Sequence, residues 1–213
     1  MKRRTILAGV GAGLLTASAG CMDIVSGETI EYEANGAQVA ETVREDAGYD
    51  YVDTHEITVE ESVSALGISR DVAATNIQTE YEKYVSFDPL GSVPAAAFSL
   101  VATPSVSFLG REFNPIEGMS NQEIADMIQD NYDDMGDLSY QESSTQDVGG
   151  EDVSVSEYLV EARLDGTPVE LTLLVSDAVS VDDDLILAIG AYPTLTPDEE
   201  THIHSLMAGI EPV

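Results

Sequence analysis

Few side chains in this sequence stand at spacings that chemistry would require. The histidines are His55, His202 and His204, and Glu200 lies four residues before His204, so that both would share one face of a helix. A zinc site needs three or four converging ligands, and no third ligand is evident here. We therefore interpret this segment as the polar face of a helix and expect neither a metal site nor a cofactor.

Three consecutive carboxylates, Asp182 to Asp184, could bind a hard cation through oxygen. They lack the alternating ligands and the central glycine of a helix-loop-helix calcium site, so we interpret them as a solvated turn. Ser105, Ser107 and Ser120 are candidate nucleophiles, but none lies in a Gly-x-Ser-x-Gly motif. A triad built from distant segments is recognised only by geometry. The sequence thus predicts no catalytic residue.

Arg111 is a candidate binding residue, because the chain has only eight basic residues against 40 acidic ones. It lies before Glu112 in a predicted loop that leads to Asn114. Its guanidinium could bind a carboxylate or phosphate ligand through two parallel hydrogen bonds. It could instead pair with a nearby carboxylate and pin the loop, which the excess of carboxylates favours. These three residues are a candidate site for a ligand or for a structural ion pair.

The first 21 residues have the layout of an export signal that ends in a cysteine. A basic start that contains Arg3 and Arg4 precedes the uncharged residues 6–20 and resembles a twin-arginine signal. Ala19-Gly20-Cys21 resembles a lipobox, after which a peptidase leaves the cysteine as a lipid-carrying N-terminus. Cys21 is the only cysteine of the chain. We expect it to carry a lipid.

This pattern predicts three parts. Residues 1–20 are the export signal with its lipobox, residues 21–34 are the lipidated cysteine and a short tether, and residues 35–213 are a single domain. The uncharged stretch is too short and too rich in glycine for a membrane-spanning helix, which needs about 20 apolar residues. We therefore expect an exported protein that is anchored to the outer face of the membrane by the lipid.

The charge of the chain restricts its partners. Residues 1–20 contain three of the eight basic residues and no acidic ones, so the remaining chain has 40 acidic and five basic side chains. This balance excludes binding to the nucleic-acid backbone and disfavours docking on anionic lipid. The acidic residues are spread evenly over the chain. This composition resembles that of proteins from halophilic archaea, in which molar salt screens the repulsion between the carboxylates. An acidic face for a basic partner or for multivalent cations is the alternative.

Hydrophobic periodicity and turn residues predict the order α-βββ-α-ββββ-α. The first helix begins after Asn35, and a Ser120–Glu123 capping box begins the second, with Ile124, Met127, Ile128 and Tyr132 on its apolar side. A third begins at Pro197, with Ile203, Leu206, Met207 and Ile210 as its apolar face. The expected strands lie near residues 57–59, 77–85, 95–102, 138–148, 153–164, 169–176 and 185–192.

Short links between these strands predict an α+β domain, in which helices pack on an antiparallel sheet of about six to seven strands. The last part resembles PsbP-like domains. The whole chain resembles a haloarchaeal family of small exported lipoproteins of unknown function, through residues 103–115, Thr75-Asn76 and Tyr81-Glu82-Lys83 together with the N-terminal signal. This resemblance implies a location at the cell surface and no particular chemistry. We expect a non-enzymatic binding or assembly-accessory domain; the alternative is a small-ligand-binding protein or hydrolase with a site near Arg111.

Overall fold

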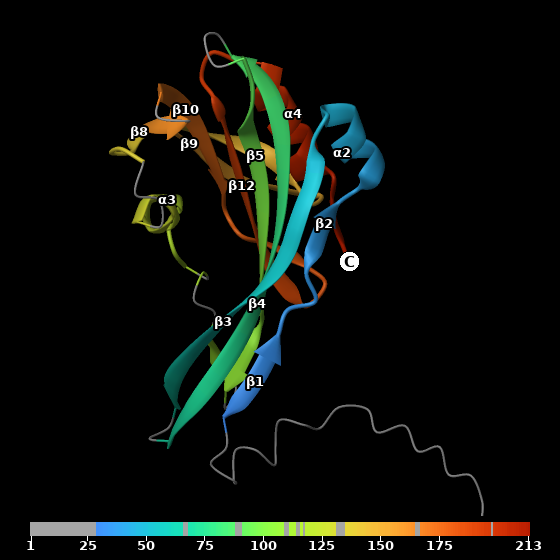
Figure 1. Ribbon diagram of the computed structural model, residues 1–213. Coiled ribbons are helices and arrows are strands. Elements are labelled where there is room, and N and C mark those ends of the chain that lie inside the picture. The colour runs from blue at the N-terminus through green and yellow to red at the C-terminus, as the bar shows by residue number, and fades with distance from the viewer. Residues whose placement is uncertain are drawn as a thin grey trace, which may run out of the picture.

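The computed structural model describes residues 29–65, 68–87, 91–108, 111–113, 116, 118–130, 135–164, 167–196 and 198–213. These residues form strands and three helices (Figure 1). No helix among them is long and apolar enough to cross a membrane. The elements are, in order, β1 (Ile30–Glu33), β2 (Ala37–Val39), α2 (Glu41–Ala47), β3 (Asp50–Ala65), β4 (Ile68–Phe87), β5 (Gly91–Pro104), β6 (Val106–Phe108), β7 (Arg111–Phe113), α3 (Asn121–Asp130), β8 (Ser139–Val148), β9 (Glu151–Leu164), β10 (Thr167–Ser176), β11 (Val179–Val181), β12 (Asp184–Pro193), α4 (Asp198–Ala208) and β13 (Ile210–Pro212).

The main sheet has nine strands in the order β1-β4-β5-β12-β10-β9-β8, with β3 paired to β4 and β11 paired to β12. All neighbours are antiparallel except β1, which runs parallel to β4. The α+β class was predicted, but the sheet is larger than expected and mixed. Strands β1 and β11 have only four and three residues, too few for an alternating pattern to be recognised in the sequence. Strand β1 also extends the folded part into residues 30–33, which were predicted as tether.

The β3–β4 hairpin is much longer than its two predicted strands. The strands have 16 and 20 residues, so β4 alone spans up to about 65 Å at ~3.3 Å per residue. Strand β5 pairs with β4 only from Ile77 onward. The hairpin therefore continues beyond β5 as an arm, which we define as residues 57–76 together with β1 (Figure 1). Most residues of β3 are exposed and polar, so the sequence lacks the alternation of apolar and polar residues from which its full length could be predicted.

Helices cover both faces of the sheet, and β5 shows the division. Phe98 and Leu100 point into a core shared with α2 and α4, whereas Val101 packs on the cluster under α3. The buried apolar side chains of α4 are Ile203, Leu206 and Met207, which were predicted from its periodicity, and Glu199 of the same helix is buried as well. In Figure 1, α2 and α4 lie on one side of the sheet and α3 lies on the other. The sheet is thus the middle of three layers.

The predicted helix after Asn35 is wrong in its first part. Residues 37–39 form β2, which pairs with β13, and the Val39 N–H donates to the Tyr81 hydroxyl at 2.9 Å. Pairing with β13 and the Tyr81 hydroxyl therefore hold residues 37–39 as a strand where a helix was predicted. Helix α2 begins only at Glu41 and has seven residues. Ile210, predicted on the last helix, lies in β13 for the same reason.

The capping box of α3 is confirmed. The Glu123 carboxylate accepts from the Ser120 N–H at 2.9 Å, and the Glu123 N–H donates back to the Ser120 hydroxyl at 3.3 Å. The predicted apolar side is confirmed for Ile124, but Met127 is 48% exposed. Tyr132 lies outside the described residues. The sequence pattern thus predicted the position of the helix correctly, but it wrongly included Met127 in the buried face.

The solvated turn predicted at Asp182 to Asp184 is correct for its first two residues only. Asp182 and Asp183 are exposed, whereas Asp184 is buried and begins β12. The Asp184 carboxylate accepts the N–H groups of Asn35 and Gly36 at 2.7 and 3.0 Å. Two backbone donors 148 and 149 residues away compensate the burial of this charge, and the sequence pattern contains no sign of them.

Candidate functional site

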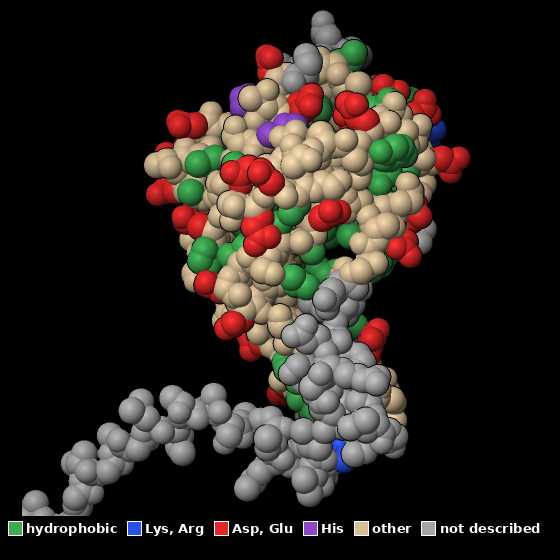
Figure 2. Space-filling model, turned by 180° about the vertical axis from the view of Figure 1, so that it is seen from behind, with side chains coloured by type: hydrophobic (Ala, Val, Ile, Leu, Met, Phe, Trp, Pro, Cys, Tyr) green, Lys and Arg blue, Asp and Glu red, His purple; other side chains and the backbone are tan. Residues whose placement is uncertain are grey.

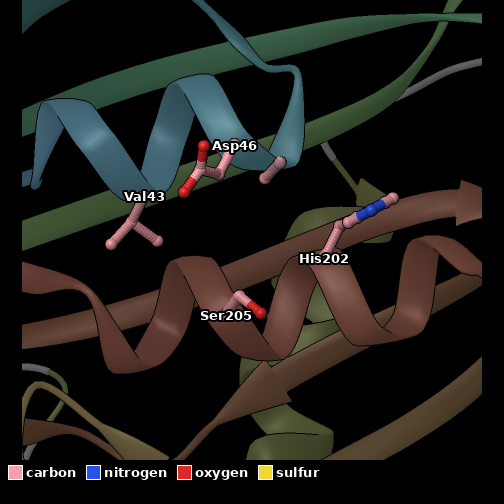
Figure 3. A pocket seen from close by; sticks show the side chains of 5 residues that line it. Val43, Asp46, His202 and Ser205 are labelled. Atoms are coloured by element: carbon pink, nitrogen blue, oxygen red, sulfur yellow. The ribbon is translucent and has the colours of Figure 1, made fainter.

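A shallow groove lies between α2 and α4. It has a volume of about 280 Å³ and is lined by Val43, Asp46, Ala47, His202 and Ser205. In Figure 3, Val43 and Asp46 project from α2, and His202 and Ser205 project from α4. One wall therefore comes from the start of the domain and the other from its end.

Turns at both ends of α2 hold the two helices close together. Gly48 ends α2 with a φ of 77°, and the chain then returns so that the Arg44 guanidinium donates to the Tyr49 carbonyl at 2.7 Å. At the other end, the Ala40 N–H donates to the carbonyl of Gly209, just after α4. A Cβ at residue 209 would lie 2.9 Å from Val43 Cγ1, so this close approach requires glycine.

Four side chains meet beside His202 of the groove, that of His202 included, and we call them the Lys83 cluster. The Lys83 Nζ lies 2.7 Å from Glu199 Oε1 and 3.0 Å from His202 Nδ1. The Tyr49 hydroxyl donates to Glu199 Oε2 at 3.2 Å, and Lys83 Nζ lies 5.5 Å from the centre of the Tyr49 ring. The cluster connects β4 to α4 and to the residue that follows the C-cap of α2.

Burial makes these contacts energetically important. The side chains of Lys83 and Glu199 are 18% and 8% exposed, so water screens their attraction only weakly. Burial, and secondly the Glu199 charge, raise the pKa of the Tyr49 hydroxyl well above its usual value, which keeps it a hydrogen-bond donor. Lys83 is the only lysine after residue 20. The chain thus uses its one remaining ammonium group to compensate a buried carboxylate.

The groove has no paired nucleophile and base among its five lining residues. The Ser205 hydroxyl donates to the Thr201 carbonyl at 2.8 Å, and the His202 ring points away from Ser205 (Figure 3). Glu199, His202 and Ser205 follow one another at helical spacing, yet they do not form a triad. His202 and Asp46 are the polar groups at the rim of the groove, beside apolar Val43.

The segment that contains His202 and His204 forms helix α4, as predicted, and the two histidines lie on different sides of this helix. His202 faces α2, while His204 lies on the other flank near Glu200. Burial lowers the pKa of His204, and the Glu200 charge opposes this shift, which agrees with the predicted shared face. Across the described residues, no group of three His, Cys, Asp or Glu side chains could hold a metal ion.

Arg111 lies in a strand and not in the predicted loop. Strand β7, which begins at Arg111 and contains Glu112, pairs with β6 in a separate two-stranded sheet. Val106 of β6 packs in the small core of the arm, so the β6–β7 sheet that contains Arg111 lies beside the arm and is not part of the groove. Asn114 lies outside the described residues, as do the predicted signal and lipidation residues Arg3, Arg4 and Cys21.

Sequence reasoning missed the Lys83 cluster, because its members look ordinary by themselves. Lys83 falls within the strand expected near residues 77–85, and Glu199 lies in the segment that was interpreted as the polar face of a helix. The rarity of lysine was the one available signal: a single lysine after residue 20, among 40 carboxylates, marks a position where a buried ion pair is worth seeking. The partner itself could be identified only from the structure.

The mixed sheet covered by helices on both faces defines an α+β protein. The chain belongs to the family described as Domain of unknown function (DUF6517), which matches residues 36–211. This match spans β2 to β13 and includes the groove and the Lys83 cluster. The family description assigns no activity.

Comparison with curated proteins gives no match. Among solved structures, the chain is similar to the solution structure of cyanobacterial PsbP (CyanoP) from Synechocystis sp. PCC 6803. The two are 10% identical, with a TM-score of 0.40, over 84% of this chain and 92% of that chain. A likeness at this level carries no inference about function.

Proposed function

We propose that this protein is an exported lipoprotein that serves as a non-enzymatic binding or assembly-accessory domain at the outer face of the membrane, in concentrated salt. The observation that carries the proposal is the layout of residues 1–21, in which Arg3 and Arg4 precede an uncharged stretch and Cys21 follows Ala19-Gly20. Lipid on Cys21 would then be the contact with the membrane.

The geometry of the groove supports binding over catalysis. Lys83, Glu199 and Tyr49 partner one another, so these groups serve to hold α4 in place. His202 and Asp46 remain partly or fully accessible at the rim, where they can contact a partner. Surface binding of this kind needs rigid walls, and the cluster supplies them by joining β4 to α4.

The distribution of charge supports adaptation to salt. Figure 2 shows acidic side chains over the visible face of the molecule, without a single concentrated patch. An excess of 35 negative charges repels strongly in dilute buffer, and molar salt shortens the Debye length to about 3 Å or less. The domain should therefore unfold when salt is dialysed away. A circular-dichroism spectrum that is the same in molar and millimolar KCl would exclude this adaptation.

Export and anchoring are tested in a haloarchaeal host by fractionation in high salt. The wild-type chain should occur in the membrane fraction with a lipid on Cys21 detectable by mass spectrometry. Cys21→Ser should release the protein to the medium or leave it unprocessed, and an Arg3→Lys, Arg4→Lys variant should accumulate as an intracellular precursor. An unmodified Cys21 in the mature wild-type protein would refute the lipoprotein proposal.

Binding is tested by affinity capture of the lipidated protein from its own membranes in high salt. A groove variant, Asp46→Arg, should lose the co-purifying partner while its melting temperature stays near that of the wild type. The matched control is Asp183→Arg, which makes the same charge change at an exposed turn away from the groove. Equal loss of the partner in both variants would exclude the groove as the binding surface.

A further inference from the structure

The described part of the domain begins at the end of the molecule that lies opposite the groove. Strand β1 starts at Ile30 and runs parallel to β4, with Ile30 beside Val72. The groove lies near Lys83, which is 11 residues farther along β4, a separation of up to about 36 Å at ~3.3 Å per residue. Figure 1 shows β1 at the end of the arm and α2 and α4 at the opposite end.

The arm is constructed as a stable extension and not as a loose hairpin. A lone two-stranded hairpin is only marginally stable in water. Here β1 adds a third strand, and β6 contributes to a small buried core. Hydroxyl pairs link the two long strands, with Thr58 and Thr75 at 3.1 Å and Ser64 and Ser69 at 2.7 Å. The members of the arm core are Ile30, Val63, Val72, Ala74 and Val106.

The length of chain before β1 places the arm close to any anchor on Cys21. Nine residue steps separate Cys21 from Ile30, and they reach at most about 30 Å when fully extended. The groove lies farther from Ile30 than the arm does, by the separation along β4 given above. Glu60, Glu61 and Asp71 are exposed near Thr29, so the arm surface itself has no attraction for anionic lipid.

We infer that the arm is a membrane-proximal spacer that holds the α2–α4 groove away from the lipid surface. This inference rests on the proposed lipidation of Cys21. It defines the kind of partner that the groove can meet: a protein in the surrounding medium, or the protruding part of another membrane protein, and not the lipid headgroups. The spacer consists of β3 and β4 with β1 paired to β4.

The experiment measures the distance of two labelled positions from lipid. The lipidated protein is reconstituted in phosphatidylcholine vesicles that contain a lipid with a nitroxide headgroup, in molar KCl. Because Cys21 is the only cysteine and is blocked by lipid, Ser64→Cys at the arm and Ser205→Cys at the groove each provide one free thiol for a fluorophore. Both serines are exposed, so the substitutions leave the core intact. Mass spectrometry and vesicle flotation are recorded for each sample.

We expect quenching by the nitroxide to be several-fold stronger for the label at residue 64 than for the label at residue 205. Equal quenching, or stronger quenching at residue 205, in a protein that carries its lipid and floats with the vesicles would overturn the spacer and leave the proposed function intact. A protein without lipid on Cys21 would overturn both. Cys21→Ser versions of each labelled protein define the quenching that occurs without an anchor.

Discussion

Replacing Lys83 by methionine is the most direct test of how this domain is held together. Methionine preserves most of the length and apolar part of the side chain but removes the ammonium group. Glu199 then stays buried, with a side chain that is 8% exposed and that has lost the cation 2.7 Å from its Oε1. The Tyr49 hydroxyl remains as its donor at 3.2 Å. The expected consequence is a buried carboxylate without its cation, which keeps only the Tyr49 hydroxyl and the contact with His202 Nδ1 at 3.4 Å.

The expected magnitude follows from the degree of burial. Removing one partner of a fully buried ion pair costs about 3–5 kcal/mol, and the remaining Tyr49 donor and the 18% exposure of Lys83 reduce this to about 2–3 kcal/mol. For a domain of this size such a loss lowers the melting temperature by roughly 4–12 °C. Because the pair is buried, the loss should be nearly the same at different molar concentrations of KCl.

The assay is thermal unfolding followed by circular dichroism in molar KCl, arranged as a double-mutant cycle with Glu199→Gln. The double variant has no buried charge without a partner, so it should be more stable than Lys83→Met alone. Arg163→Met is the matched control, since it removes an exposed cation, and it should change stability by no more than about 0.5 kcal/mol. A Lys83→Met loss equal to that of the control, or strictly additive losses in the cycle, would refute the reasoning.

Three further predictions use the same melting assay. Gly190→Ala places a Cβ 2.5 Å from Ile203 Cγ2 and should cost about 1–3 kcal/mol by overpacking, so an unchanged melt would contradict the close contact of β12 and α4. Asp184→Ala leaves two backbone N–H groups without their acceptor and should cost about 2–4 kcal/mol, whereas Asp183→Ala at the exposed turn should be neutral. Burial lowers the pKa of His204, so stability should fall as the pH drops below about 6.5, where the unfolded chain takes up the proton first. His204→Gln should flatten this decline between pH 7 and 5, and an identical slope in both proteins would exclude His204 as its source.

Local signals in the sequence were sufficient to predict most elements. The Ser120–Glu123 capping box predicted the start of α3, since both partners lie within one helical turn. Gly149 and Gly150 predicted the β8–β9 turn, and both adopt the positive φ that favours glycine. Strand β2 could not be predicted in this way, because residues that look helical are held by a hydroxyl from Tyr81 and by pairing with β13.

The candidate site could be predicted only in fragments. His202 was identified as a polar residue on the last helix, and the structure shows that it faces α2 and contacts Lys83. Its neighbour in the cluster is 119 positions away in the chain, and the Tyr49–Glu199 contact joins residues 150 positions apart. Arg111, the residue that composition made most prominent, lies in a small separate sheet beside the arm.

By itself the sequence determined the charge of the chain, the layout of its first 21 residues and the periodicity of its longer elements, because each of these depends on residues close together in the chain or on a simple total. Only the tertiary structure decided which of the 40 carboxylates lose contact with water. Glu199 and Asp184 have the same composition around them as their exposed neighbours, yet one lies against Lys83 and the other against two backbone N–H groups. The cost of burying a charge depends on which distant groups the fold brings to it, and that is a property of packing and not of local sequence.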